Sequence, residues 1–203
     1  MKKIKVAVLV SGGGTNLGAL IAAEKKGIIT SGEISLVISN KVGAYALERA
    51  KAVGIEALTV TKAECGSQEA FEDRLLEELR SRGIELIVFA GFMAILSEKF
   101  TSAYKDRIIN VHPSLIPSFC GKGFYGLRVH EAALEYGVKV TGATVHYVNE
   151  IPDGGKIILQ KSVEIQDGDT PELLQKRVME EAEWIILPKA CELVSKKLLA
   201  DRE

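Results

Sequence analysis

The segment from Asn110 to Pro117 carries the residue types best suited to catalysis. It reads Asn-Val-His-Pro-Ser-Leu-Ile-Pro and follows a short apolar stretch that we expect to be a strand. Side chains two positions apart on a strand face the same side, so Asn110 and His112 would point into one region. The amide of Asn110 can donate to a developing oxyanion, and the imidazole of His112 can donate as imidazolium or shuttle a proton. Pro113 and Pro117 restrict the backbone and would hold these two groups in place.

The other histidines and the cysteines are weaker candidates. His130 falls on an expected helix without a motif and is assigned to structure, whereas His146 falls in an expected strand and its role stays open. Cys120 lies eight residues beyond His112. A Cys/His nucleophile pair is therefore conceivable, but no third group that would orient it is apparent. Three scattered histidines and three scattered cysteines show no ligand spacing, so we expect no metal.

A glycine loop, Ser11-Gly12-Gly13-Gly14-Thr15-Asn16, separates an expected strand from an expected helix. The first N–H groups of a helix have no intrahelical partners, and glycines let a ligand approach them, so such a loop can bind an anion. Leu17 stands where a dinucleotide motif needs a third glycine, and a P-loop would need Lys where Ala19 stands. The loop therefore indicates a phosphate on something smaller than a dinucleotide. A tight turn without a ligand is the alternative.

Asp153 lies in a second loop, Ile151-Pro152-Asp153-Gly154-Gly155, between two stretches of high β-propensity. Aspartate followed by two glycines is also ordinary turn chemistry. Taken alone, this segment favours a turn over a site.

Apolar strands that alternate with amphipathic helices must position these groups. This order predicts an α/β, Rossmann-like fold, with a mostly parallel twisted sheet, helices on both faces and an antiparallel hairpin in its C-terminal part. We expect an irregular segment over 111–126, and a final helix that starts at Thr170-Pro171-Glu172 and is kinked or divided at Pro188. The expected strands are 4–10, 34–38, 57–60, 84–90, 108–109, 139–148 and 156–165. The expected helices before the last are one after the glycine loop, with Leu17, Leu20 and Ile21 at helical spacing, and those over 44–53, 71–82 and 127–136.

Composition places the chain among ordinary globular proteins. It has 203 residues, 47% of them hydrophobic and 26% charged, and a formal net charge of -1. This length predicts one domain, and the absence of a basic excess argues against a nucleic-acid partner. Lysines precede an apolar run at the N-terminus, but the run is too short for a signal peptide or a membrane span. With the sparse, odd cysteine count, these features predict a cytoplasmic protein without a membrane partner.

Four motifs occur in order along the chain: S-G-G-G-T-N at 11–16, A-G-F-M-A-I-L at 90–96, N-V-H-P-S-L-I-P at 110–117 and D-G-G at 153–155. Together they resemble the folate-dependent formyltransferases, and among them the glycinamide ribonucleotide formyltransferases, from about residue 4 to about residue 190. The resemblance implies transfer of the formyl group of 10-formyltetrahydrofolate to the amine of glycinamide ribonucleotide in purine biosynthesis. It also divides the domain, 1–203, into a phosphate-binding half, about 1–105, and a folate and catalytic half, about 106–203.

The resemblance further implies roles for particular residues. Asn110 and protonated His112 would stabilise a tetrahedral oxyanion, Asp153 would raise the pKa of His112, and no covalent enzyme intermediate would form. Glu183 would contact the glycinamide end of the substrate. The remaining implied contacts are Gly14, Thr15 and Asn16 to the phosphate, and Met93, Ala94, Ile95, Leu96 and Asn110 to the folate. The partners would be these two small molecules, and the protein would be a monomer or a homodimer.

The chain departs from the family pattern at several positions. Gln68 and Ala94 stand where basic residues are frequent, and the stretch 118–126 is longer than the usual turn. Lys122 in that stretch is our candidate for the missing positive charge.

Three alternatives remain open. Methionyl-tRNA formyltransferase carries a C-terminal nucleic-acid-binding domain, which we do not expect in a chain that stops at residue 203. Formyltetrahydrofolate hydrolase carries an N-terminal regulatory domain, which we do not expect in a chain that begins at its first strand. A non-catalytic binding module for a sugar phosphate would leave Asn110, His112 and Asp153 without a common task.

Overall fold

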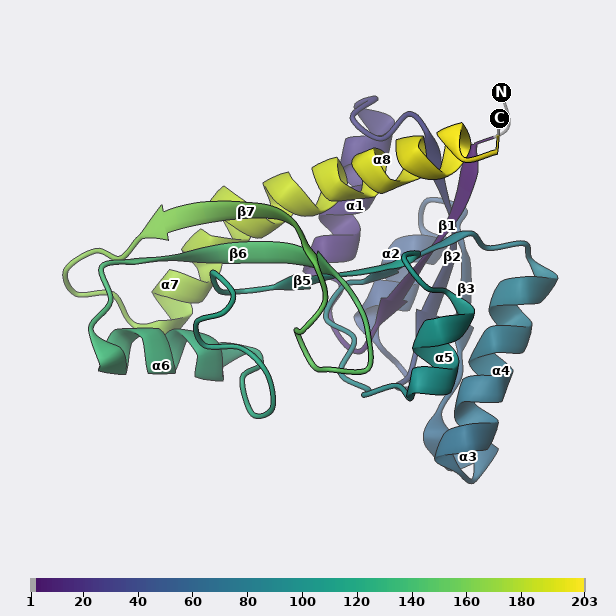
Figure 1. Ribbon diagram of the computed structural model, residues 1–203, viewed down its shortest axis with the longest axis horizontal. Coiled ribbons are helices and arrows are strands. Elements are labelled where there is room, and N and C mark those ends of the chain that lie inside the picture. Colours follow the sequence, from purple (N-terminus) through teal and green to yellow (C-terminus); the bar gives the residue numbers. More distant parts are fainter. Residues whose placement is uncertain (1–2, 203) are drawn as a thin grey trace.

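One mixed sheet of seven strands forms the centre of the computed structural model, which describes residues 3–202 (Figure 1). The ends of the expected domain, residues 1–2 and 203, lie outside the described residues. The strands are β1 (Ile4–Val10), β2 (Gly32–Ser39), β3 (Glu56–Thr59), β4 (Leu86–Phe89), β5 (Ile108–His112), β6 (Val140–Tyr147) and β7 (Ile157–Glu164).

The strand order is β3-β2-β1-β4-β5-β6-β7. Strands β1 to β5 pair in parallel, whereas β6 pairs antiparallel with both β5 and β7. Figure 1 shows β6 and β7 as long strands that extend beyond the parallel part of the sheet. The predicted fold class, a mostly parallel Rossmann-like sheet with a C-terminal antiparallel hairpin, is confirmed.

Alternation along the strands produces two cores, one on each face of the sheet. In β1, Val6 and Val8 belong to one core, and Ala7 and Leu9 belong to the other. The first core is covered by α1 (Thr15–Lys25), α2 (Tyr45–Lys51) and α8 (Trp184–Ala200), and the second by α4 (Gln68–Ser81) and α5 (Glu98–Ala103).

Two short helices were not expected from the sequence. Helix α3 (Lys62–Cys65) begins where the Thr61 side chain accepts a hydrogen bond from the Glu64 N–H. Helix α5 begins in the same way at Ser97. Each is shorter than two turns, so neither shows a helical period in the sequence. Side-chain caps rather than apolar patterns mark their starts.

The expected division of the final helix at Pro188 is wrong. Helix α7 (Pro171–Val178) starts as predicted, with Thr170 as its N-cap, but the interruption that follows is the π-helical turn η1 (Met179–Glu183). There the Trp184 N–H bonds to the Met179 carbonyl, so hydrogen bonding shifts from the fourth preceding residue to the fifth. Pro188 lies buried inside α8, which continues past it. The widened turn, and not the missing N–H of the proline, divides the final helix.

The irregular segment after β5 is fixed to the antiparallel part of the sheet. The Thr144 hydroxyl donates to the Ser114 carbonyl (2.7 Å) and accepts from the Ile116 N–H (3.1 Å), and the Ile116–Pro117 peptide is cis. The segment leads into α6 (Leu127–Tyr136), which packs beside α7 (Figure 1). Among residues 3–202, no helix combines the length and apolar character that a membrane crossing requires.

Candidate active site

The loops that follow β1, β4 and β5 meet at one edge of the sheet. The strand order changes direction between β1 and β4, and ligands of open α/β sheets bind beside such a point, at the carboxyl ends of the strands. The Ser11 hydroxyl accepts a 2.8 Å hydrogen bond from the Met93 N–H and so joins the glycine loop to the segment after β4. The first three sequence motifs follow the neighbouring parallel strands β1, β4 and β5, and therefore lie together at the carboxyl ends of these strands.

The glycine loop is crowded at one position and open at the two before it. Gly14 has φ 70°, and a Cβ there would lie 2.6 Å from the Cβ of Ala46. A side chain at Gly12 or Gly13 would meet no atom within 4 Å. Packing therefore requires glycine at Gly14, whereas Gly12 and Gly13 leave free space over the start of α1.

Asn16 and Glu183 form a buried pair behind the glycine loop. Asn16 Nδ2 donates to Glu183 Oε2 at 2.7 Å, and Asn16 Oδ1 is buried without a protein partner among the described residues. Burial raises the pKa of Glu183 to about 7, against the lowering effect of the Asn16 hydrogen bond. Sequence reasoning placed Glu183 at the glycinamide end of a substrate, and the structure places it beside the loop assigned to the phosphate.

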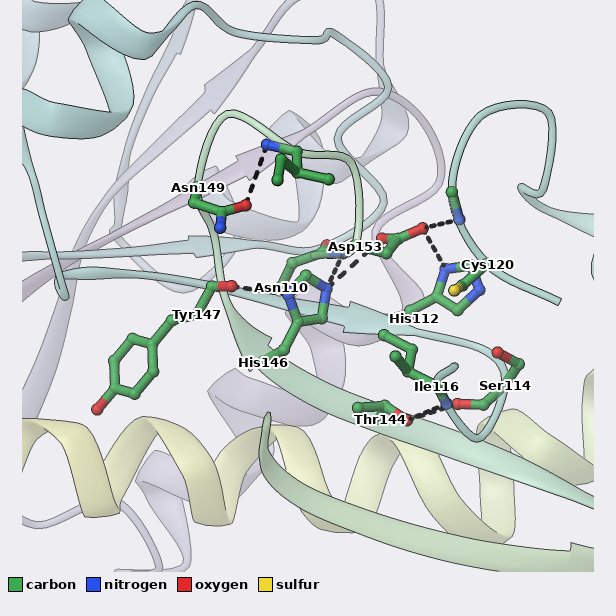
Figure 2. A network of polar contacts seen from close by, with 12 residues as sticks. Asn110, His112, Ser114, Ile116, Cys120, Thr144, His146, Tyr147, Asn149 and Asp153 are labelled. Carbon is green, nitrogen blue, oxygen red and sulfur yellow. Dashed lines mark hydrogen bonds and ion pairs between the residues drawn. The ribbon is translucent and has the colours of Figure 1, made fainter. Parts of the chain in front are cut away.

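Asn110, His112 and Asp153 converge between β5 and the β6–β7 loop (Figure 2). Asp153 Oδ2 lies 3.4 Å from His112 Nδ1 and accepts a 2.8 Å hydrogen bond from the Gly121 N–H. His112 Nε2 donates to the Phe119 carbonyl at 2.8 Å. Both contacts tie the 118–126 stretch to the two ionisable side chains. Crowding explains the glycines after Asp153, because a Cβ at Gly155 would lie 1.7 Å from the Tyr147 carbonyl oxygen.

The charge states of His112 and Asp153 depend on burial and on each other. Burial lowers the pKa of His112, while the charge of Asp153 and the Phe119 hydrogen bond act in the opposite direction. The effect of Asp153 thus has the expected sign, but desolvation outweighs it and the net shift is downward. Burial would raise the pKa of Asp153, but the contacts with His146, His112 and Gly121 outweigh it and hold that pKa below its usual value. The carboxylate is therefore charged at neutral pH, and the Phe119 carbonyl holds a proton on Nε2 of His112.

His146 belongs to the same cluster, although its role stayed open in the sequence analysis. Its Nε2 lies 3.2 Å from Asn110 Nδ2 and 3.5 Å from Asp153 Oδ1, and its Nδ1 donates to the Tyr147 carbonyl at 2.8 Å. The signal that could have found it is strand register, because His146 lies directly opposite Asn110 in the β5–β6 pairing.

Two cavities adjoin this cluster. The larger, about 670 Å³, extends from Asn16 and Glu183 past His112 and Asp153 to Lys122 and Tyr125. The smaller, about 130 Å³, is lined mainly by apolar groups that include Phe89, Phe92 and Leu96. Ala94, Ile95, Asn110 and Asp153 line both cavities, and Met93 lines only the larger. Gly14 and Thr15 lie outside the lining of either cavity.

The surroundings of Cys120 and His130 do not favour a catalytic role for either side chain. Burial raises the pKa of the Cys120 thiol, and the charge of Asp153 adds to this, which disfavours a nucleophilic thiolate. Both ring nitrogens of His130 are buried without a partner in residues 3–202, and burial lowers its pKa to about 4. No cluster of three or more His, Cys, Asp or Glu side chains suited to a metal occurs among the described residues.

Sequence comparison shows the family to which this fold belongs. Residues 4–191 match the formyl transferase family, and the chain belongs to it. Within that family it is 41% identical over 184 residues to the phosphoribosylglycinamide formyltransferase of Haemophilus influenzae. This alignment covers 91% of this chain and 84% of the relative.

Further relatives agree with this assignment. The crystal structure of glycinamide ribonucleotide transformylase 1 from Symbiobacterium toebii has a TM-score of 0.89 and 41% identity, and covers 96% of this chain and 89% of that one. The chain is also 46% identical over 196 residues, 95% of its length, to the trifunctional purine biosynthetic protein adenosine-3 of Gallus gallus. It spans only 18% of that relative and 62% of the chloroplastic phosphoribosylglycinamide formyltransferase of Arabidopsis thaliana.

Proposed function

We propose that this chain transfers the formyl group of 10-formyltetrahydrofolate to the amine of glycinamide ribonucleotide, a step of purine biosynthesis. One observation carries the proposal: Asn110 and Asp153 line both cavities, and His112, which lines the larger one, lies 3.4 Å from Asp153. The large cavity suits a phosphorylated amine, and the small one suits a flat aromatic ring system. The reacting atoms of the two molecules would meet beside the cluster.

The phosphate would bind over the glycine loop. The open backbone at Gly12 and Gly13 and the unpaired N–H groups at the start of α1 support this assignment. We assign Gly14, Thr15 and Asn16 to this end of the substrate and keep Glu183 as a contact nearer its amine. With a pKa of about 7, Glu183 can donate as well as accept a hydrogen bond.

The folate ring would enter the smaller cavity. Phe89, Phe92 and Leu96 supply apolar walls. The backbone of Met93 to Leu96, which is in neither a helix nor a strand, has groups free to bond the edge of the ring. These features fit 10-formyltetrahydrofolate as the co-substrate and Met93, Ala94, Ile95, Leu96 and Asn110 as its contacts.

In the reaction, a C–N bond forms between the substrate amine and the formyl carbon, the bond from that carbon to the carrier nitrogen breaks, and a proton moves from the amine to that nitrogen. Asn110 would donate to the formyl oxygen as it gains negative charge. His112, neutral with Nε2–H held by Phe119, would take the amine proton at Nδ1. The resulting imidazolium would stabilise the oxyanion, and Asp153, 3.4 Å away, would stabilise the imidazolium. His112 would then give this proton to the carrier nitrogen as the bond from the formyl carbon to that nitrogen breaks.

We further propose that residues 1–203 act as one formyltransferase domain in the cytoplasm, as a monomer or a homodimer. The two small molecules would be its only substrates. A common sheet and continuous cores on both of its faces support a single domain.

The test is a formyl-transfer assay with the purified chain. Incubation with 10-formyltetrahydrofolate and glycinamide ribonucleotide is expected to change the folate absorbance only when the amine is present, and mass spectrometry is expected to detect formylated amine. Loss of the formyl group without the amine would instead identify a hydrolase. No reaction in either case, with the ribonucleotide bound, would identify a binding module.

A further inference from the structure

His146 occupies a position that the proposed reaction does not yet use. It is buried on β6, directly opposite Asn110, with only 1% of its surface exposed. Figure 2 shows its ring between Asn110 and Asp153, and the carbonyl of Tyr147 lies at its other nitrogen. The ring thus bridges its own strand and the proposed catalytic groups.

The tautomer of His146 follows from its backbone contact. Nδ1 lies 2.8 Å from the Tyr147 carbonyl oxygen, which can only accept, so Nδ1 carries a proton. In the neutral ring Nε2 then has a lone pair and no proton. At 3.2 Å from Asn110 Nδ2, this lone pair is within reach of an amide N–H, and Asp153 Oδ1 lies farther from Nε2, at 3.5 Å.

This tautomer decides the orientation of the Asn110 amide. Rotation of the amide by half a turn would place Oδ1 against the lone pair of Nε2, with no proton between them. The amide is therefore held with one N–H on His146, and it keeps its second N–H and its carbonyl oxygen for ligands. A proton on Nε2 would reverse the preference, because Nε2–H would donate to Asp153 or to Asn110 Oδ1.

We propose that His146, held as its neutral Nδ1–H tautomer by Tyr147, is a positioning residue that fixes the amide of Asn110 and so determines which of its polar atoms face the reacting groups. The charged or titratable groups that face the ring are Asp153 and His112. The effect on catalysis rests on the proposed function, but the tautomer does not.

The first test is direct and needs no variant of His146. A long-range ¹H–¹⁵N spectrum of the whole protein distinguishes the two neutral tautomers and the cation, and the chain has only three histidines to assign. The Nδ1–H tautomer of His146 is expected. The Nε2–H tautomer or the imidazolium would overturn the proposal, whatever the activity of the protein.

The second test is a double-mutant cycle on turnover. His146→Leu is expected to lower kcat by about tenfold or more, the value of one hydrogen bond, with the KM of both substrates within about threefold of wild type. His146→Gln, whose carbonyl can accept from Asn110, is expected to recover most of the loss. Val145→Ala, a neighbouring buried change on the other face of β6, controls for destabilisation and is expected to keep wild-type turnover.

The background variants separate the routes of action. In Asn110→Ala, the further change His146→Leu is expected to cost nothing, because the amide it positions is gone. His146→Leu could instead lower kcat in the Asn110→Ala background by the same factor as in wild type, and have no effect on kcat in the Asp153→Asn background. That result would show that His146 acts through the carboxylate, and would overturn the proposal. Absence of amine-dependent transfer in the wild type would refute the proposed function and leave the tautomer test standing.

Discussion

Replacing Asp153 by asparagine removes one charge while it keeps the shape of the side chain. The amide oxygen of the new side chain can still accept from the Gly121 N–H, which donates to Asp153 at 2.8 Å. The 118–126 stretch should therefore stay in place. What is lost is the negative charge beside His112 Nδ1.

The separation of the two groups sets the expected size of the effect. His112 Nδ1 and Asp153 Oδ2 are 3.4 Å apart. At an effective dielectric constant of about 20, opposite unit charges at this separation attract by about 5 kcal/mol. We take about half of this attraction, about 2.5 kcal/mol, as lost on going from Asp153 to asparagine, which corresponds to a turnover about 70-fold slower.

The assay is steady-state formyl transfer across a range of pH. The kcat of Asp153→Asn is expected to fall with little change in either KM, and the limb of the pH profile that belongs to His112 is expected to move to lower pH, because the carboxylate that raises the pKa of His112 is gone. Wild-type turnover in this variant, with an unchanged profile, would remove Asp153 from the mechanism.

Three further substitutions test other parts of the site. Gly14→Ala is expected to lower the free energy of unfolding by about 1–3 kcal/mol, because of its φ of 70° and its contact with Ala46, whereas Gly13→Ala costs less than about 0.5 kcal/mol in chemical denaturation. At pH values above about 7, Glu183→Gln is expected to have a higher melting temperature than the wild type. The same variant is expected to bind the ribonucleotide more weakly in calorimetry. The pKa of Glu183 is raised to about 7 from 4.5, so wild-type stability falls as pH rises through that interval, and the difference should vanish below it. Cys120→Ser is expected to keep full turnover, and a large loss would revive a thiol nucleophile.

Local patterns predicted most of the fold. The apolar run of β1 was located to the residue, and the expected helix over 127–136 coincides with α6, because periodicity and glycine ends are local features. The turn η1 was missed, since no residue type marks a π-helical turn. Pro188 misled because a proline removes only one hydrogen bond, which the packing of a buried helix can tolerate.

Residue spacing alone predicted the site only where one segment supplies two of its groups, and Asp153 was assigned to it through the family resemblance. Asn110 and His112 lie two residues apart on one strand, so their common direction followed from the sequence. His146 joins them through the register of β6 against β5, and its position depends on pairing between distant segments. The downward shift in the pKa of His112 depends on burial, which motif spacing does not report.

Because of the widened turn at Met179–Glu183, the position of the preceding helix depends more on the number of residues in this turn than on their types. Deleting one residue between Met179 and Ala182 would allow α-helical bonding to run through this turn and would rotate the preceding helix by about 100° relative to α8. Leu174 and Val178, which now face the core, would turn away from it, and Glu183 would lose its place beside Asn16. A shortened chain of this kind would keep its helical content and lose its site, whereas most single substitutions on the outer side of the same turn would change neither.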